Sequence, residues 1–503
     1  MSQAASPGAH GDETAAIADD PPAGGPGRGL VAAVVCAGVV LVNLDLFIVN
    51  VAVPAMARTW SGTDLADLSW VLNGYAVVFA ALLVPAGRLA DRSGHRAAFL
   101  RGTAVFTVAS ALCAAAPGVG WLVGARLLQA AGAAFLMPSS LGLLLTSFPP
   151  EKRAAIVRVW AAIAGLAAAL GPVLGGLLVE PGWRWVFLVN VPIGVLAVAL
   201  GARILPGGPP AARTPLPDLL GAAVFVVGIG ALALGLVKAD DWGWASPRAL
   251  AAWAVFVVLA AWFALRSLRH AHPVVDPALL RIRAFSVAGF ASLLFGVAFA
   301  GMLLAITLWS QDVWGWSALR TGCALTPGPL LVPPTAILAG KWAARTGPGP
   351  LAAAGGVVFA GGTLWWAATL DLDSAYAASM LPGMLLTGLG VGLMMPTLVA
   401  AAATALPPAH AATGSGVVTM LRQLGSVLGV ALVVVLLGTP SDAAAILDGF
   451  DRVWYVVTGA SLAAAAAAGL LVRRTPAATG AAAPGAAAYR AGEDNSAALG
   501  KAT

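Results

Sequence analysis

The chain has 503 residues, of which 59% are hydrophobic and only 10% are charged, against roughly 25% charged residues in ordinary soluble domains. These totals exclude a soluble globular protein and indicate an all-α polytopic membrane protein. The formal net charge of +6 could indicate a nucleic-acid partner. The distribution of the basic residues along the chain is instead explained by membrane topology.

The two ends of the chain differ from its middle. Residues 1–29 and 475–503 are polar or of low complexity, so we expect disordered tails there. Between them, a length of about 17 to 25 apolar residues per membrane-spanning helix predicts fourteen spans. In chain order the spans are residues 30–56, 69–87, 98–116, 120–147, 156–179, 184–204, 216–237, 248–267, 284–310, 320–341, 350–370, 376–402, 411–438 and 453–472.

Lysine and arginine are distributed unequally between the two sets of loops. Twenty of the 28 basic residues lie in the tails and in every second loop, whereas six lie in the opposite loops. Because cytoplasmic loops are enriched in Lys and Arg, both termini are expected in the cytoplasm. The two remaining basic residues, Arg126 and Arg422, fall within predicted spans.

A weak internal repeat predicts two related halves. The segment GRLADRSG (87–94) follows the second span, and GKWAARTG (340–347) follows the tenth. If these spans correspond, residues 30–204 form an N-terminal six-helix bundle and residues 284–474 a C-terminal one. Residues 205–283 then hold two inserted transmembrane helices and their linkers.

Asp45 is the only one of the 22 acidic residues that lies deep within a predicted span. A charged side chain at the bilayer centre costs about 2.5 to 3.5 kcal/mol on insertion scales, so it should face protein or a watery cavity and mark a functional site. Arg126 poses the complementary problem in the fourth span. We expect the two side chains to share a site, in which the arginine favours the ionised carboxyl group and burial favours the protonated one. A permanent structural ion pair is the alternative.

Other functional classes find little support. The three cysteines lie in apolar segments without a CxxC pair, and all five histidines lie in the N-terminal tail or in loops predicted to be cytoplasmic, so no metal site is expected. Neither HExxH nor a GxSxG nucleophile pattern occurs, which argues against a membrane-embedded enzyme. A passive channel fits poorly because the sequence offers no pore-like ring of charges.

Several motifs resemble those of one family. LDLFIVNVAVP (44–54) resembles the first-span motif of the fourteen-span drug:proton antiporter branch of the major facilitator superfamily. GRLADRSGHR (87–96) is similar to the loop between spans 2 and 3 of that superfamily, LVGARLLQAAGAA (122–134) to its fourth-span motif, and LGPVLGGLL (170–178) to its antiporter motif. WRWVFLVNVPIG (183–194) and MLRQLGSVLGVA (420–431) also resemble this branch. The resemblance implies two six-helix bundles plus two inserted helices.

The resemblance also implies roles for individual residues. It associates Asp45 and Arg126 with proton coupling. It implies a gating motif in which glycines allow tight turns and Asp91 pairs with a nearby arginine and a helix N-terminus of the other half; Ala344 replaces this aspartate in the second copy. The gating residues are Gly87, Asp91, Arg92, Gly94 and Arg96, and the antiporter helix motif comprises Gly171, Pro172, Gly175 and Gly176.

Together these features predict export of small amphiphilic compounds, such as drugs, antibiotics or secondary metabolites, in exchange for protons. A proton-coupled importer of the same fold is the alternative. The proton gradient would supply the energy without a cofactor, and the expected partners are a small-molecule substrate and membrane lipid, with no nucleic acid, for a monomer in the bacterial inner membrane. The predicted walls of the substrate cavity are Tyr75, Phe79, Gln129, Gln311, Met395 and Arg422.

Overall fold

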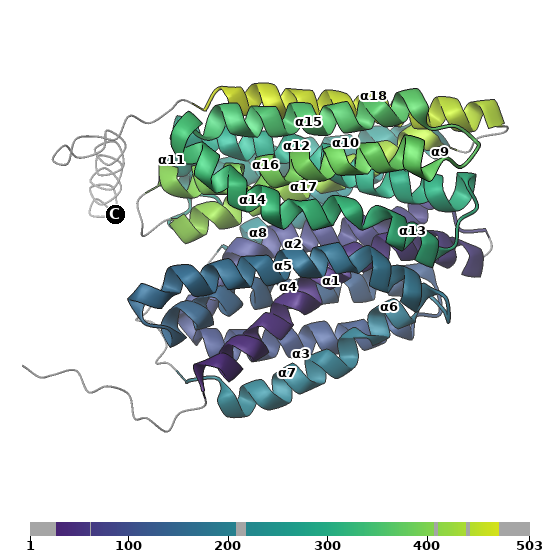
Figure 1. Cartoon of the computed structure of the whole chain (residues 1–503). Helices are drawn as coiled ribbons and strands as arrows, with labels where there is room; N and C mark the ends of the chain where they lie inside the picture. Colours follow the sequence, from purple (N-terminus) through teal and green to yellow (C-terminus); the bar gives the residue numbers. More distant parts are fainter. Residues whose placement is uncertain (1–26, 61, 208–217, 407–410, 439–442, 472–503) are drawn as a thin grey trace, which may run out of the picture.

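The computed structural model describes residues 27–60, 62–207, 218–406, 411–438 and 443–471, and within these ranges the chain is built of helices (Figure 1). Both predicted disordered tails lie almost entirely outside the described residues. Arg28 and Gly29, which we assigned to the N-terminal tail, belong instead to the first helix.

The helices of the N-terminal half follow the first six predicted spans. They are α1 (Arg28–Thr59), α2 (Leu65–Ser93), α3 (His95–Ala114), α4 (Val119–Ser147), α5 (Pro150–Val179), α6 (Trp185–Leu188) and α7 (Asn190–Ile204). The sixth predicted span is broken at Val189, which separates the short α6 from α7.

The C-terminal half follows the last six predicted spans. Its helices are α12 (Arg283–Leu308), the π-helical segment η1 (Trp309–Val313), α13 (Ala318–Leu325), α14 (Pro327–Thr346), α15 (Pro348–Thr369), the π-helical segment η2 (Tyr376–Met380), α16 (Leu381–Ala405), α17 (Ala411–Leu437) and α18 (Ala443–Gly469). Figure 1 shows this half, coloured green to yellow, stacked on the purple and blue N-terminal half.

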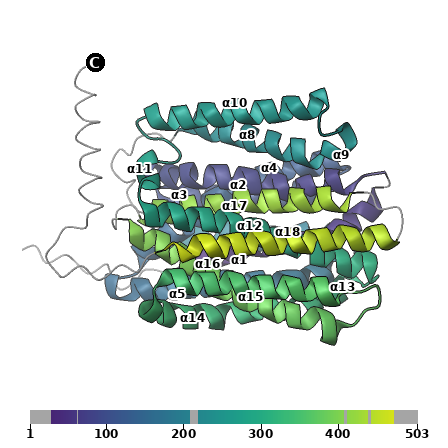
Figure 2. The same ribbon diagram turned by 90° about the horizontal axis from the view of Figure 1, so that it is seen from above.

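Four helices connect the halves: α8 (Leu219–Val237), α9 (Ala239–Trp242), α10 (Pro247–Arg269) and α11 (Pro277–Leu280). Helix α8 packs on α2 and α17, and α10 packs mainly on α8, so the pair forms an outer layer over the junction of the two halves (Figure 2). At one end Lys238 contacts the carboxylates of Asp64 at 3.0 Å and Asp67 at 2.9 Å. At the other end Arg266 contacts Asp218 at 2.8 Å, which ties α10 to α8.

Twelve helices among the described residues are long and apolar enough to cross a membrane. Helix α5 contributes only a shorter apolar segment, Ile163–Val179, and α18 is not among the twelve. The all-α polytopic fold is therefore confirmed, whereas the count of fourteen spans and the cytoplasmic position of the termini stay predictions.

The predicted repeat has a structural counterpart at two turns. Gly94 links α2 to α3 with a φ of 86°, and Gly347 links α14 to α15 with a φ of 91°; only glycine adopts this region at little cost. Gly87 is different, because it lies inside α2, where an added Cβ would meet Pro138 of α4 at 3.6 Å. The prediction of a turn at Gly87 is wrong, since α2 continues to Ser93.

The two halves contact each other mainly through α2 with α17 and through α5 with α13 and α14, and α1 also contacts α12 and α13. At the end of the molecule where α1 finishes, Gly176 lies against the backbone of Ala318 and Gly322 against that of Pro172. At the same end, the side-chain amide of Gln311 donates to the carbonyl of Val51 at 3.0 Å. These contacts close the space between the halves at this end.

Candidate functional site

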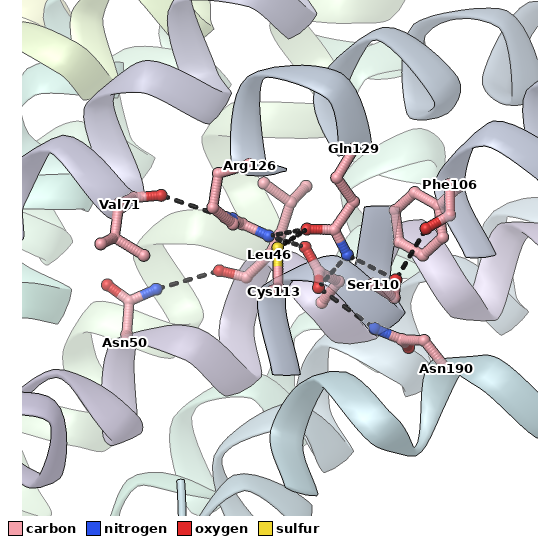
Figure 3. Close-up of polar contacts among 10 residues, drawn as sticks. Leu46, Asn50, Val71, Phe106, Ser110, Cys113, Arg126, Gln129 and Asn190 are labelled. Atoms are coloured by element: carbon pink, nitrogen blue, oxygen red, sulfur yellow. Dashed lines mark hydrogen bonds and ion pairs between the residues drawn. The ribbon is translucent and has the colours of Figure 1, made fainter. Parts of the chain in front are cut away.

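The side chain of Asp45 has three hydrogen-bond partners within the N-terminal half, Arg126, Gln129 and Asn190, which are labelled in Figure 3. Its carboxylate accepts hydrogen bonds from Arg126 at 2.5 Å, Gln129 at 2.9 Å and Asn190 at 3.2 Å. Asp45 is 0% exposed and Arg126 is 1% exposed. The structure thus brings together the two charges that the sequence predicted would share a site, from α1 and α4.

Arg126 has further partners that hold its guanidinium in place. It donates to the carbonyl of Val71 on α2 at 3.1 Å and to Gln129 at 2.6 Å. The ring of Tyr75 lies under the guanidinium, with 4.1 Å from the guanidinium carbon to the ring centroid, which adds a cation–π attraction. The arginine charge is therefore compensated by a carboxylate, two oxygen acceptors and an aromatic face.

The sequence reasoning gave no role to three side chains of the network, one of which is Cys113 of α3, whose thiol contacts the amide oxygen of Gln129 at 3.8 Å. Ser110 of α3 accepts a hydrogen bond from Gln129 at 2.8 Å, and Asn190 stands at the start of α7. Asn190 belongs to the segment WRWVFLVNVPIG, whose resemblance we noted without giving its asparagine a role. Because polar side chains inside a span need partners, the asparagine in that apolar run was the available signal.

The site is enclosed, which differs from the expected cavity. Tyr75 and Phe79 are buried and stacked on each other at 6.0 Å between ring centroids, and Gln129 belongs to the Asp45 network. A pocket of about 680 Å³ does exist, but it lies at the end of α1 beside the start of α2 and α4 and is lined by none of the predicted site residues. In this conformation Asp45 is reached only after the surrounding helices rearrange.

The other predicted cavity residues lie in the C-terminal half. Gln311 is buried in the contact with Val51, and its side-chain oxygen has no hydrogen-bond partner. Met395 of α16 packs against the hydrophobic core of the C-terminal half. Arg422 is the twelfth residue of the 27-residue helix α17 and is partly buried. None of the three joins the Asp45 network.

The predicted gating motif lies where α2 meets α3. The carboxylate of Asp91 lies 3.6 Å from Nε2 of His95, four residues further along the chain. The guanidinium of Arg96 donates to the carbonyl of Ala202 on α7 at 2.6 Å. Arg92 also makes an interaction. The expected contact of Asp91 with the other half stays a prediction.

The antiporter motif packs α5 closely against both halves. An added Cβ at Gly171 would meet Phe47 at 2.6 Å, and one at Gly175 would meet Ile48 at 3.0 Å, so these glycines admit α1. Gly176 and Pro172 contact α13 instead, as described above. The motif therefore lies between the helix that carries Asp45 and the opposite half, as small residues at close helix contacts allow.

Comparison with known proteins identifies the class to which this architecture belongs. Residues 35–430 match the Major Facilitator Superfamily, and the chain belongs to that family. Solved peptide transporters have the same fold: one crystal structure of a POT peptide transporter with sulfate has a TM-score of 0.64 and 16% identity over 88% of this chain and 95% of its own. The protein is a multi-pass membrane transporter of the inner membrane and not an enzyme.

Curated relatives are more similar in sequence. The methylenomycin A resistance protein of Streptomyces coelicolor is 34% identical over 80% of this chain and 85% of its own length. The tetracenomycin C resistance and export protein of Streptomyces glaucescens is 35% identical, with 85% and 79% covered. The cephamycin export protein of Amycolatopsis lactamdurans is 34% identical, with 80% and 84% covered.

Proposed function

We propose that this transporter exports small amphiphilic compounds, antibiotics or related metabolites, in exchange for protons carried by Asp45. The relatives named for resistance to or export of methylenomycin A, tetracenomycin C and cephamycin support the direction and the cargo class. The observation that carries the proton step is the fully buried carboxylate of Asp45 in the middle of α1. An ionisable group in that position is costly unless function requires it.

All three partners of Asp45 donate hydrogen bonds to its carboxylate in this conformation. A protonated carboxyl would instead need an acceptor for its own O–H. Asn190 can supply one, since its side-chain oxygen is buried without a hydrogen-bond partner and turning the amide by 180° exchanges donor for acceptor. Protonation would then weaken the pair with Arg126, which keeps Gln129 and the Val71 carbonyl as acceptors.

This exchange of partners gives the two protonation states different packing in the N-terminal half. Such a difference is necessary, because a ligand shifts a conformational equilibrium only if it binds the two states unequally. The halves would rock against each other and separate the α5–α13 contacts, which opens the end that is closed here. Each elementary charge that moves inward across the whole membrane contributes about 2.3 kcal/mol per 100 mV.

The test compares wild-type protein, Asp45→Asn and a matched control, Asp371→Asn, whose carboxylate is exposed and bonds only its neighbouring backbone N–H. In inverted membrane vesicles with an acidified lumen, we expect ethidium and a panel of neutral and zwitterionic antibiotics to accumulate with wild type and D371N. We expect no gradient-driven accumulation with D45N. Export by D45N at the wild-type rate would overturn the assignment of Asp45.

The same vesicles separate export from import. An exporter that exchanges cargo for protons accumulates cargo in the acidified lumen, whereas a proton-coupled importer releases preloaded cargo from it. Release in place of accumulation would therefore favour the importer and contradict the proposed direction.

A further inference from the structure

Helix α17 carries a charge that the Asp45 network does not use. Arg422 lies near the middle of this helix, and among the described residues its guanidinium has no hydrogen bond or ion pair. Arginine stays protonated in proteins and has no acceptor capacity, so Arg422 cannot exchange protons with Asp45 as a relay. A permanent, uncompensated cation within a membrane span calls for a partner.

The packing of α17 shows which way Arg422 faces. One face of the helix lies against α12, where an added Cβ at Gly425 would meet Gly296 at 3.0 Å. The opposite face lies against α2, where an added Cβ at Gly416 would meet the side chain of Val84 at 3.5 Å. With 3.6 residues per turn, Arg422 falls between these two faces, together with Ser415, Thr419 and Ser426, all partly buried. We call these four residues the polar stripe.

The position of α8 decides between the two sides on which the polar stripe could lie. Ala431 and Val434 of α17 form an apolar cluster with Ala66 of α2 and Val237 of α8, and these α17 positions turn away from the polar stripe. Figure 2 shows α8 and α10 on the outer side of α2 and α17, with α1 and α16 on the other. The polar stripe therefore faces the interior between the halves and not the lipid.

No acidic side chain in the described part of the chain pairs with Arg422. Asp45 is the only acidic residue deep in a predicted span, and its carboxylate is already bound by Arg126 at 2.5 Å. The hydroxyls of Thr419 and Ser426 donate to backbone carbonyls of their own helix at 2.9 Å and 3.1 Å, so they do not neutralise charge. The described residues therefore leave the charge of Arg422 available to an anion from outside the chain.

We propose that Arg422 is an anion subsite of the substrate path, so that the exported compounds include amphiphiles with a carboxylate or an equivalent acidic group. This inference rests on the proposed export function and specifies its cargo. Arg422 would bind the acidic group through its guanidinium. Exchange of a monoanion for one proton moves two charge equivalents in the direction that an inside-negative potential favours.

Binding to the purified full chain in nanodiscs of zwitterionic lipid tests the proposal without proton coupling. The probes are pyrene-1-butyric acid and anthracene-9-carboxylic acid, each paired with its methyl ester, and empty nanodiscs correct for partition into lipid. We expect wild type to bind at least one acid about tenfold more tightly than its ester, Arg422→Gln to bind both alike, and Arg422→Lys to keep part of the preference. The control Arg452→Gln removes an exposed arginine of α18 and should keep the wild-type ratio.

Two results would overturn the proposal. The first is that wild type binds neither acid more tightly than its ester, a comparison that does not depend on the folding of any variant. The second is that R422Q keeps the full preference for the acid. Proton-driven ethidium efflux by R422Q separates this failure from failure of the export function: efflux without acid preference leaves export intact. Loss of ethidium efflux in folded R422Q would assign Arg422 to the proton machinery instead.

Discussion

Arg126 of the N-terminal half and Arg422 of the C-terminal half both lie near the middle of long apolar helices, but their surroundings differ. Arg126 is fully buried and bound to Asp45, Gln129, the Val71 carbonyl and the ring of Tyr75. Arg422 is only partly buried and has none of these partners among the described residues. The same side chain is therefore part of a closed network in one half and an open charge in the other.

This difference separates two tasks that a proton-coupled exporter must perform. A closed network can hold a proton-dependent carboxylate in a defined state, because three donors bind the carboxylate and the arginine has acceptors of its own. An open cation suits recognition, because its binding energy stays available to whatever enters between the halves. We therefore expect substitutions in the N-terminal network to affect stability and coupling, and substitutions at Arg422 to affect cargo choice.

The largest expected effect comes from comparing Arg126→Leu with Arg422→Leu. Removing Arg126 leaves the buried carboxylate of Asp45 without its countercharge, which typically costs about 3 to 5 kcal/mol. Removing Arg422 leaves no charge unpaired, so its effect on stability should be small or favourable. Thermal unfolding of the purified variants in detergent measures the difference.

The double variant Asp45→Asn/Arg126→Leu completes this comparison. It should unfold at a higher temperature than Arg126→Leu alone, because both members of the pair are then neutral. An equal loss of stability in R126L and R422L would contradict the distinction between the two arginines.

A smaller effect is expected at Asn190, at the edge of the same network. Asn190→Leu removes one donor from the Asp45 carboxylate, and a hydrogen bond to a charged group contributes about 1.5 to 3 kcal/mol. The matched control is Asn50→Leu, since Asn50 bonds only the carbonyl of Leu46 in its own helix at 3.0 Å.

A double-mutant cycle with Asp45→Asn measures the coupling of Asn190 to the charge. N190L should cost less in the D45N background, whereas N50L should cost the same in both. Equal costs of N190L in the two backgrounds would show that Asn190 does not respond to the state of Asp45.

The smallest effect concerns a third arginine, Arg266, which is partly exposed and paired with Asp218. Burial alone would raise the pKa of Asp218, but hydrogen bonds from Arg266 and the Gly221 N–H hold it below its ordinary value. Because the folded pKa is lowered, the pair stabilises the protein above the ordinary pKa of an aspartate, and this stabilisation is lost as pH falls through the folded value.

Asp218→Asn should therefore lower the unfolding temperature slightly near pH 7 relative to wild type, and the difference should shrink as the pH approaches about 3. Thermal unfolding at a series of pH values measures it. A difference that stays constant over this range would show that the ion pair is not its cause.

Much of the fold followed from the sequence. Apolar length placed a helix in each predicted span, because a membrane helix must satisfy its own backbone hydrogen bonds over a fixed thickness. The glycines of GRLADRSG and GKWAARTG marked equivalent turns at Gly94 and Gly347. Gly87 was misassigned because a glycine in a motif is compatible with a helix interior as well as with a turn, and only contact with Pro138 of α4 explains it.

The sequence by itself determined that Asp45 and Arg126 had to find partners, since unpaired charges are too costly within a membrane. Only the tertiary structure decided that these partners include Gln129 and Asn190 and that Asp45 is enclosed. It also decided that no acidic side chain among the described residues pairs with Arg422. The physical reason is that charge cost depends on residue type and depth, whereas pairing depends on which helices, far apart in the chain, are brought into contact.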